Sequence, residues 1–330
     1  MINPKQNLSE NIFKKNIEQA STRIGFGEGL LIAGEKNINV VALSADLEES
    51  VHVNLFKEKF PQRFFETGVA EQAMITVSSG LANYGKIPFA ASYSVFSPGR
   101  TWEQIRTTIC INNVPVKIIG SHTGLTVGPD GATHQMLEDF ALMRSLPNMI
   151  VISPCDAEEA KKATLEIAKN NKPSYLRLTR ASTPVFTTDR TPFNIGKAET
   201  FWESKNPLVA IIATGPLVYE SLLAAKGLQN RMDVLVINCH TIKPLDELAI
   251  IRAAKTCGAI ITVEDHQING GLGSAVAECL SKNFPTPIEM VAVEDKFGES
   301  GSPDELLEKY NLTKENIIEK VKKVIARKNS

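Results

Sequence analysis

The sequence predicts an α/β protein built from two doubly wound domains. Apolar, β-rich runs alternate with helical patterns along the chain, and this alternation breaks only once, between about residues 180 and 207. The strand candidates do not alternate with polar residues, which is typical of parallel strands covered by helices on both faces of a sheet. We therefore expect a first domain over residues 1–190, a linker over 191–206 and a second domain over 207–330.

The first series alternates regularly. Its strands are expected at Val40–Leu43, Ile87–Ala91, Val116–Ile119, Met149–Ile152 and Tyr175–Leu178. Its helices are expected at about Asn11–Ala33, Val69–Tyr84, Arg100–Cys110, Gln135–Ser145 and Ala157–Lys169. The series ends where serine, threonine, proline and aspartate gather, a composition that favours a linker.

The second series repeats the same plan. Its strands are expected at Leu208–Ala213, Val234–Ile237, Ala259–Val263 and Ile288–Val293. Its helices are expected at about Val218–Leu228, Leu245–Ala254, Gly273–Lys282 and Lys314–Ala326.

The composition excludes several classes of function. A net charge of −1 gives no field that would attract nucleic acid or an anionic membrane. No apolar run reaches the span of a bilayer, and the N-terminus lacks the apolar core of a signal peptide. The five cysteines form no Cys-x-x-Cys pair, so neither a disulfide framework nor a zinc site is indicated, and a reducing, cytoplasmic setting is expected.

Three unusual segments follow predicted strands: Ser44–Leu47, Ser92–Gly99 and Gly120–His134. In open α/β sheets, ligands bind beyond the carboxyl ends of the strands. We therefore expect these three segments to converge on one site.

The segment Glu66–Met74 places a carboxylate, Glu71, at the start of a helix that is predicted to be buried. A buried carboxylate is costly unless it has a partner, and a buried, paired acid is a candidate functional group. The alternative is a helix-start acid that the helix dipole stabilises.

The longest irregular segment contains His122, Asp130 and His134 among four glycines. Long ordered loops in compact domains are commonly functional, and histidine can move protons near neutral pH. A metal site made by these three side chains is conceivable, but their spacing matches no closed metal motif.

Aromatic and basic side chains complete the candidate set. Tyr93 and Phe96 could stack on a flat heteroaromatic ligand, or could simply pack in the core. The arginines at segment edges suit a phosphate or sulfonate group, or could be solvated or ion-paired: Arg23, Arg100, Arg106 and Arg180.

Together these segments resemble the thiamine-diphosphate enzymes, and specifically the C-terminal half of transketolase. The resemblance covers essentially the whole chain and is carried by four motifs: Gly68-Val69-Ala70-Glu71-Gln72, Ser44-Ala45-Asp46-Leu47, Asp130-Gly131-Ala132-Thr133-His134-Gln135 and Phe297-Gly298-Glu299-Ser300-Gly301. It implies a thiamine-diphosphate pyrimidine-binding domain with a parallel sheet, followed by the transketolase C-terminal domain.

The resemblance also implies a role for each matching residue. Glu71 would hydrogen-bond the N1′ nitrogen of the cofactor's aminopyrimidine, and so control the proton chemistry that activates the cofactor. Tyr93 and Phe96 would stack on the pyrimidine, with one expected aromatic missing around Gly99, and Asp46 would lie near the thiazolium. His134 would contact the reacting oxygens of the donor ketose, and Asp130 would contact a substrate hydroxyl. The phosphate end of the sugar channel would be formed by Arg23, Ser50, His122 and Arg180.

One feature of the family is missing. The family holds Mg²⁺ and the diphosphate through a Gly-Asp-Gly element and a downstream asparagine, and this chain contains no Gly-Asp-Gly. The first helical pattern begins by about residue 11, which leaves no room for an N-terminal domain. The resemblance therefore implies one subunit of a split transketolase, with magnesium ligands supplied by a diphosphate-binding partner chain in an α2β2 assembly.

Three alternatives stay open at this point. The beta subunit of a 2-oxo acid dehydrogenase has a similar length and the same two-domain plan, but the segments around Asp46 and His134 resemble transketolase instead. Deoxyxylulose-phosphate synthase shares the Asp-Gly-x-Thr-His-Gln pattern, but normally carries its N-terminal half in the same chain. A non-catalytic scaffold subunit would have no need for the polar set that includes Glu71, Asp130 and His134. The sugars, and a phosphate or sulfonate tail, are left open.

Overall fold

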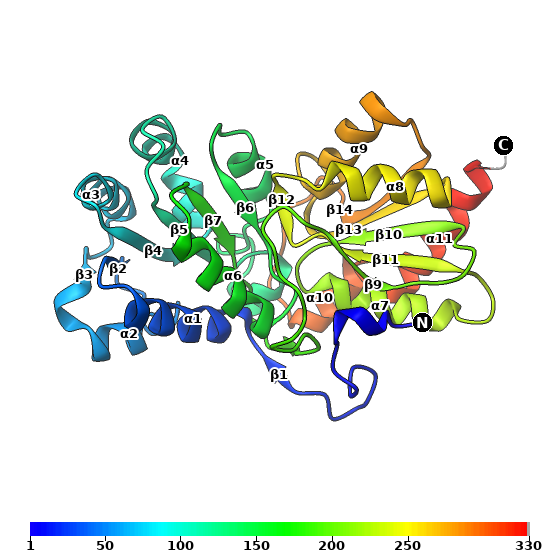
Figure 1. Ribbon diagram of the computed structural model, residues 1–330, viewed down its shortest axis with the longest axis horizontal. Helices are drawn as coiled ribbons and strands as arrows, with labels where there is room; N and C mark the ends of the chain where they lie inside the picture. Colours follow the sequence, from blue (N-terminus) through cyan, green and yellow to red (C-terminus); the bar gives the residue numbers. More distant parts are fainter. Residues whose placement is uncertain (329–330) are drawn as a thin grey trace.

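A computed structural model describes residues 1–328, which form two β-sheets lying side by side (Figure 1). The first sheet has seven strands in the order β12-β6-β7-β5-β4-β2-β3: β2 (Val40–Ser44), β3 (Phe64–Glu66), β4 (Ile87–Tyr93), β5 (Lys117–Ser121), β6 (Ile150–Ile152), β7 (Ser174–Arg177) and β12 (Thr241–Lys243). The second has five strands in the order β14-β13-β10-β11-β9: β9 (Glu199–Trp202), β10 (Val209–Ala213), β11 (Val234–Asn238), β13 (Ile260–Gln267) and β14 (Ile288–Val293). A short antiparallel pair joins β1 (Gln19–Ala20) to β8 (Thr183–Pro184).

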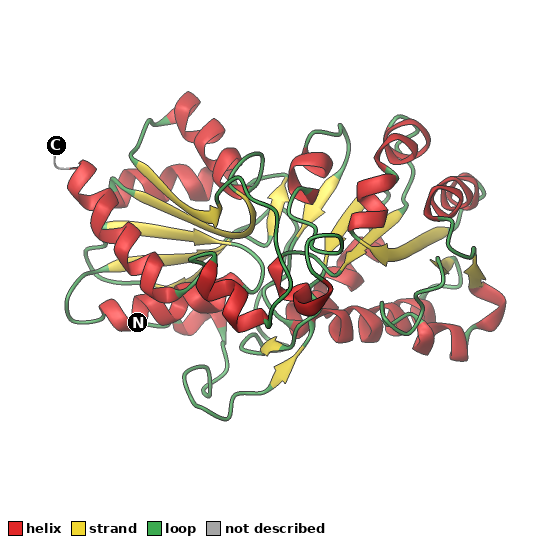
Figure 2. Cartoon of the chain, turned by 180° about the vertical axis from the view of Figure 1, so that it is seen from behind, coloured by secondary structure: helices red, strands yellow, loops and turns green. Residues whose placement is uncertain are grey.

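Helices cover both faces of each sheet, as the two opposite views show (Figures 1 and 2). The α-helices are α1 (Thr22–Lys36), α2 (Asn54–Lys59), α3 (Glu71–Asn83), α4 (Trp102–Gln104), α5 (Asp139–Arg144), α6 (Ala157–Lys169), α7 (Leu217–Leu228), α8 (Glu247–Cys257), α9 (Leu272–Asn283), α10 (Pro303–Lys309) and α11 (Lys314–Lys328). The short irregular helices are η1 (Pro4–Gln6), η2 (Pro61–Arg63), η3 (Val95–Arg100), η4 (Ile105–Cys110) and η5 (Leu125–Asp130). None of these helices is long and apolar enough to cross a membrane.

Strand β2 shows how the sheet builds two cores. All five of its residues are buried. Val41 and Leu43 belong to the core under α3 and α5, whereas Val40 and Ala42 belong to the core under α1 and α6. Successive side chains of a strand point to opposite faces, so an uninterrupted apolar run is required when both faces are covered. The predicted fold class of two α/β domains is confirmed.

The inner strands of the first sheet are parallel. Strand β2 pairs with β3 and β4, β4 pairs with β5, and β5 pairs with β7, all in parallel register. Their carboxyl ends therefore lie along one edge of the sheet. Within the two large sheets, antiparallel pairing is confined to two edge strands: β12, which pairs with β6, and β9, which pairs with β11.

The predicted helix at Asn11–Ala33 is wrong in its first half. Helix α1 begins only at Thr22, and Ile12 and Ile17 are instead buried in the core of the second domain. Long-range apolar contacts override the local helical pattern here, because burying two isoleucines is worth several kcal/mol, about 1.5–3 for each.

The helix expected at Arg100–Cys110 is confirmed from Trp102 to Cys110, where α4 continues directly into η4. Two further expectations need correction. Helix α3, which was expected to be buried, has exposed residues along one side, including Ala73 and Val77. Residues 191–206 are not wholly irregular, because they contain β9, whose Phe201 and Trp202 are buried in the second domain.

Candidate active site

All ten predicted site residues lie along the carboxyl edge of the first sheet. They lie at the end of β4, after β2, β3, β4, β5 or β7, or at the start of α1, whose N-terminus reaches the same edge. The set consists of Arg23, Asp46, Ser50, Glu71, Tyr93, Phe96, His122, Asp130, His134 and Arg180. Parallel strand register brings these residues, which are up to 157 positions apart, to one edge.

Glu71 is the first residue of α3 and is only 2% exposed. Its Oε2 accepts a hydrogen bond from Nη1 of Arg100 at 3.2 Å, and the side chain of Arg100 is 53% exposed. The Arg100 guanidinium also lies over the ring of Phe96, 5.1 Å from its centroid. Both interpretations of Glu71 therefore hold, since it is a helix-start acid and a buried, paired carboxylate.

Glu66 fixes the turns that carry two of the predicted residues, and the sequence assigned it no role. Its Oε1 accepts from the backbone N–H of Asp46 at 2.8 Å and from that of Gly68 at 2.7 Å. Asp46 and Gly68 both have positive φ angles, of 60° and 65°. A single carboxylate oxygen therefore links the turn after β2 to the turn before Glu71.

Four rings form a wall beside Arg100: the half-buried rings of Tyr93, Phe96 and His134 and the buried ring of His122. Tyr93 stacks on His122 with centroids 3.7 Å apart and on Phe96 with centroids 5.9 Å apart. His134 meets the edges of this stack, with its centroid 6.2 Å from that of Tyr93 and 5.8 Å from that of Phe96. The two aromatics predicted to form a stacking surface therefore contact the two histidines predicted to contact substrate.

His122 is buried, with 2% of its surface exposed, and its Nδ1 lies 2.8 Å from Ser121 Oγ. Burial, followed by nearby positive charge, lowers the pKa of His122 to about 3. The neighbours that contribute are Arg23, Arg180, His134 and His52. The imidazole is therefore neutral at physiological pH and can donate only one hydrogen bond.

Arginine side chains surround His122. Arg23 donates through Nη1 to the carbonyl of Ser50 at 2.5 Å and through Nη2 to the carbonyl of Arg180 at 3.0 Å. The pKa of the Arg23 guanidinium is lowered overall. Burial is the main cause and the charge of Arg180 adds to it, while Tyr93 acts in the opposite direction. Arg180 in turn donates to the carbonyl of Val127 at 2.6 Å.

His52 joins this group and was missed by the sequence analysis, although it lies two residues after Ser50. Burial and then the charge of Arg23 lower its pKa. We call Arg23, His52, His122 and Arg180 the basic cluster. The charged neighbours that lower the pKa values of its two histidines are arginines and histidines, which is the electrostatic character of an anion site.

Residues 122–134 form the loop that carries the remaining predicted groups; we call this segment the His122–His134 loop. Asp130 is exposed at the end of η5, and His134 is half-buried with its Nδ1 2.9 Å from Thr133 Oγ1. Gln135, which was quoted only as part of a motif, donates from Nε2 to the carbonyls of Leu125, Gly128 and Glu299, at 3.2, 3.4 and 2.9 Å.

The side chains here are of the types that the resemblance assigns to the ring end of thiamine diphosphate, but they form no metal site within residues 1–328. Glu71 and the aromatic pair offer a carboxylate and a stacking surface within one edge. By contrast, residues 1–328 contain no group of three or more His, Cys, Asp or Glu side chains that could hold a metal ion, so the conceivable site at His122, Asp130 and His134 does not form. All five cysteines are free and buried, and burial raises the pKa of each thiol. None of them is therefore an activated nucleophile.

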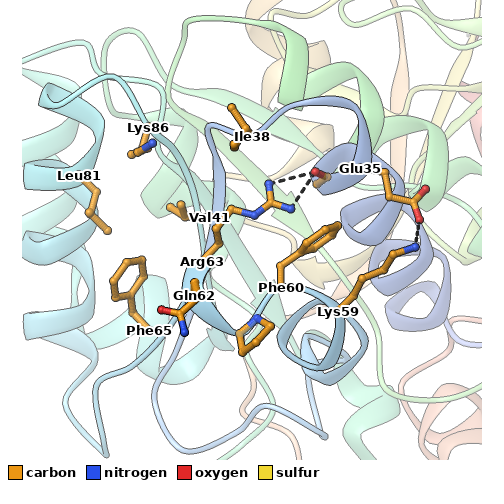
Figure 3. A pocket seen from close by; sticks show the side chains of 12 residues that line it. Glu35, Ile38, Val41, Lys59, Phe60, Gln62, Arg63, Phe65, Leu81 and Lys86 are labelled. Atoms are coloured by element: carbon orange, nitrogen blue, oxygen red, sulfur yellow. Dashed lines mark hydrogen bonds and ion pairs between the residues drawn. The ribbon is translucent and has the colours of Figure 1, made fainter.

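The apolar hollow drawn in Figure 3 is separate from this site. It encloses about 650 Å³ beside edge strand β3 and shares no residue with the predicted set. Arg63 lies across it, donates to the carbonyl of Gly34 at 3.0 Å and stacks over the ring of Phe60 at 3.7 Å. These contacts connect the C-terminal end of α1 to the segment before β3. Arg63 therefore has a structural role in this hollow.

Known proteins match this chain over most of its length. Residues 18–185 match the family described as transketolase, pyrimidine binding domain, and residues 196–317 match transketolase, C-terminal domain. The chain belongs to the transketolase family. The resemblance identified from the four motifs is therefore confirmed, as is the order of the two domains.

Relatives of similar length are also named as parts of transketolases. The chain is 43% identical to a Methanocaldococcus jannaschii protein provisionally named a transketolase C-terminal section, over 91% of this chain and 94% of that protein. It is 39% identical to a 6-deoxy-6-sulfo-D-fructose transketolase subunit from Clostridium sp. strain MSTE9, over 96% of this chain and 98% of that subunit. A solved structure titled split gene transketolase, inactive beta4 tetramer, superimposes with a TM-score of 0.86 at 39% identity, covering 93% of this chain and 98% of that one.

The low pKa of His122 makes a titration prediction for this member of the family. Since the folded pKa of about 3 lies below the ordinary value of 6.5, we expect no titration of the His122 ring between pH 5 and 8 in imidazole NMR spectra. The depressed pKa also makes the folded state less stable as the pH falls below 6.5. Relative to His122→Asn, the wild-type chain should lose up to about 2 kcal/mol of unfolding free energy between pH 6.5 and 5. A ring titrating near pH 6.5 would contradict the environment described for His122.

Proposed function

We propose that this chain is the C-terminal subunit of a split transketolase, which transfers a two-carbon ketol unit from a ketose phosphate to an aldose phosphate through thiamine diphosphate. The observation that carries the proposal is the placement of Glu71 beside the aromatic wall, on the same sheet edge as the basic cluster. A proton-control group, a stacking surface and an anion site are the three requirements of a thiamine-dependent reaction on a sugar phosphate.

The cofactor supplies the carbanion chemistry when it is bound. In our proposal, Glu71 hydrogen-bonds the N1′ nitrogen of the aminopyrimidine, while Tyr93 and Phe96 hold the ring by stacking and Asp46 lies near the thiazolium. Arg100 need not leave Glu71 for this bond to form, because its Nη1 donates to Oε2 and the second oxygen, Oε1, can make the bond to N1′.

The reacting end of the sugar would lie at His134, and its anionic tail would lie at the basic cluster. His134 would hydrogen-bond the reacting oxygens of the donor, and Asp130 would accept from a substrate hydroxyl. Arg23, Ser50, His122 and Arg180 would hold the anionic tail, with neutral His122 donating a hydrogen bond. One relative is named for a sulfonated sugar, so a sulfonate tail is the variation of this proposal that the relatives support.

The magnesium and diphosphate end would come from a partner chain, in an α2β2 complex that we place in the cytoplasm. Relatives that this chain covers almost end to end are named as a section or a subunit, and a related structure of beta chains alone is titled inactive. The chain contains no Gly-Asp-Gly element, the motif through which the family holds Mg²⁺ and the diphosphate. The five free, buried cysteines suit a reducing compartment.

Substitution of Glu71 tests the catalytic proposal and separates it from a scaffold role. Glu71→Ala in the complex with the diphosphate-binding subunit should lower ketol-transfer turnover by about 100-fold or more, because general acid–base groups contribute 10²–10⁴-fold. Glu103→Ala, which removes an exposed carboxylate from α4, is the control and should keep wild-type turnover. Unchanged turnover in Glu71→Ala, at an unchanged melting temperature, would support a scaffold.

Arg180 is expected to bind the anionic tail. Loss of one charge-assisted hydrogen bond costs about 1.5–3 kcal/mol, so Arg180→Met should raise the KM for a sugar phosphate about 10- to 100-fold. The KM for an uncharged ketose donor, which lacks the phosphate, should change less than threefold. All kinetic constants of the control variant Arg190→Met, which alters an exposed side chain, should also change less than threefold. An equal rise for charged and uncharged donors would show that Arg180 only supports the loop through Val127.

A further inference from the structure

Strand β13 of the second domain ends in three consecutive residues that each bond to the first domain: Asp265, His266 and Gln267. Asp265 Oδ1 accepts from the backbone N–H of Leu125 at 3.1 Å. His266 Nε2 accepts from the N–H of Phe140 at 3.2 Å. The N–H of Gln267 donates to the carbonyl of Leu137 at 2.8 Å. We call these three residues the β13 bracket.

The bracket holds both ends of one loop. Leu125 lies three residues after His122, and Leu137 lies three residues after His134, so the bracketed segment contains Asp130 and His134. The two ends also bond to each other, because the N–H of Gly124 donates to the carbonyl of Met136 at 2.8 Å. A loop whose ends meet in this way behaves as one compact unit.

Contact between the bracket and the loop is close. Gly124 has φ +70°, and a Cβ at this position would lie 1.8 Å from Asp265 Oδ2. No side chain larger than hydrogen fits there, so the carboxylate of Asp265 lies directly against the loop backbone. The segment before α10 adds a second contact from the same domain, since the carbonyl of Glu299 accepts from Gln135 Nε2.

A buried ion pair between Arg177 and Asp139 also contacts the bracket. Arg177 Nε donates to Asp139 Oδ2 at 2.8 Å, and its Nη2 donates to the carbonyl of Asp265 at 2.7 Å. The Arg177 guanidinium lies 4.6 Å from the ring centroid of Phe140, on which His266 stacks at 5.0 Å. The end of β7, the start of α5 and the end of β13 are therefore one buried unit.

Protonation states are consistent with these bonds. Burial lowers the pKa of His266 to about 4, so the ring is neutral near pH 7. Its Nδ1 lies 2.7 Å from the carbonyl of Gln267 and must carry the proton, which leaves Nε2 free to accept from Phe140. Burial raises the pKa of Asp265, while Arg177 and the Leu125 N–H lower it.

We propose that the second domain acts in catalysis by positioning the His122–His134 loop, with Asp265 and Gln135 as the positioning residues. The catalytic part of this inference rests on the proposed function. The mechanical part does not, because it concerns only which contacts keep the loop ordered. A second domain that merely adds stability would not need Asp265 and Gln267 bonded to the two ends of the one loop that carries Asp130 and His134, with His266 bonded to the helix that follows it.

Amide hydrogen exchange on the chain itself tests the mechanical part. Asp265→Ala removes the acceptor for Leu125, whereas Asp265→Asn keeps an acceptor oxygen. We expect peptides covering residues 122–134 to exchange at least about 10-fold faster in the alanine variant, and near the wild-type rate in the asparagine variant. Asp246→Ala is the control, because it removes another largely buried carboxylate of the second domain that accepts two backbone N–H groups, those of Ala198 and Ala249. Loop exchange at the wild-type rate in Asp265→Ala, or equally fast in the control, would overturn the proposal.

A second variant covers the case in which Asp265→Ala does not fold. Gln135→Leu removes all three bonds from Nε2 while keeping the size of the side chain and removing no buried charge. It should also accelerate exchange in residues 122–134 and leave the peptide of β2 protected. Protection of the loop equal to wild type in Gln135→Leu would contradict its positioning role.

Kinetics in the complex with the diphosphate-binding subunit test the catalytic part. Asp265→Ala should lower kcat about 10- to 100-fold, because misplacement by about 1 Å can cost 10² in rate. Thiamine diphosphate affinity should change less than threefold, since Glu71 and Phe96 lie outside the loop, and Asp265→Asn should restore kcat. Equal losses in kcat and cofactor affinity would indicate general damage and reject the inference. If the wild-type complex shows no ketol transfer, the proposed function fails, and hydrogen exchange still decides whether the bracket orders the loop.

Discussion

Parallel register between β2, β3, β4, β5 and β7 is the constraint on which the rest of the structure depends. Parallel strands all end at the same edge, so the segments that follow them must meet there, however distant they are in sequence. The strands can be parallel only because both faces are covered, and each face has its own apolar core. Glu71, the aromatic wall and the basic cluster then occupy one edge. The second domain contacts the loop at this edge through the hydrogen bonds of the β13 bracket.

Charge is divided along this edge in a way that suits the two ends of a bound cofactor and sugar. Glu71 pairs with Arg100 next to Phe96, whereas the pKa of His122 is lowered by burial and by Arg23, Arg180 and His52 among its neighbours. The first region can take a ring nitrogen, and the second can take an anion. Between them lies the His122–His134 loop. Because the sequence contains no Gly-Asp-Gly element, our proposal assigns the diphosphate end to another chain.

Sequence patterns predicted those parts of the structure that depend on local chemistry. The apolar run at β2 identifies a buried strand, and Asp156, whose side chain accepts from Glu159 N–H, gives α6 its predicted start. The ten site residues were placed on one edge by the rule for parallel sheets together with the family resemblance. Glu66, His52 and the β13 bracket were missed, because each acts through a partner that is distant in sequence. Ile12 and Ile17 were assigned to a helix for the same reason, since their burial depends on the second domain.

Calorimetric titration of thiamine diphosphate with Mg²⁺ tests the central claim, that this chain holds half of a shared site. The chain alone, the diphosphate-binding subunit alone and their mixture should be titrated at the same concentrations. We predict that only the mixture binds tightly, with an affinity at least about 100-fold above that of either chain, which corresponds to about 3 kcal/mol. Ketol transfer should appear only in the mixture. Binding by the isolated chain as tight as in the mixture, with turnover to match, would contradict the account.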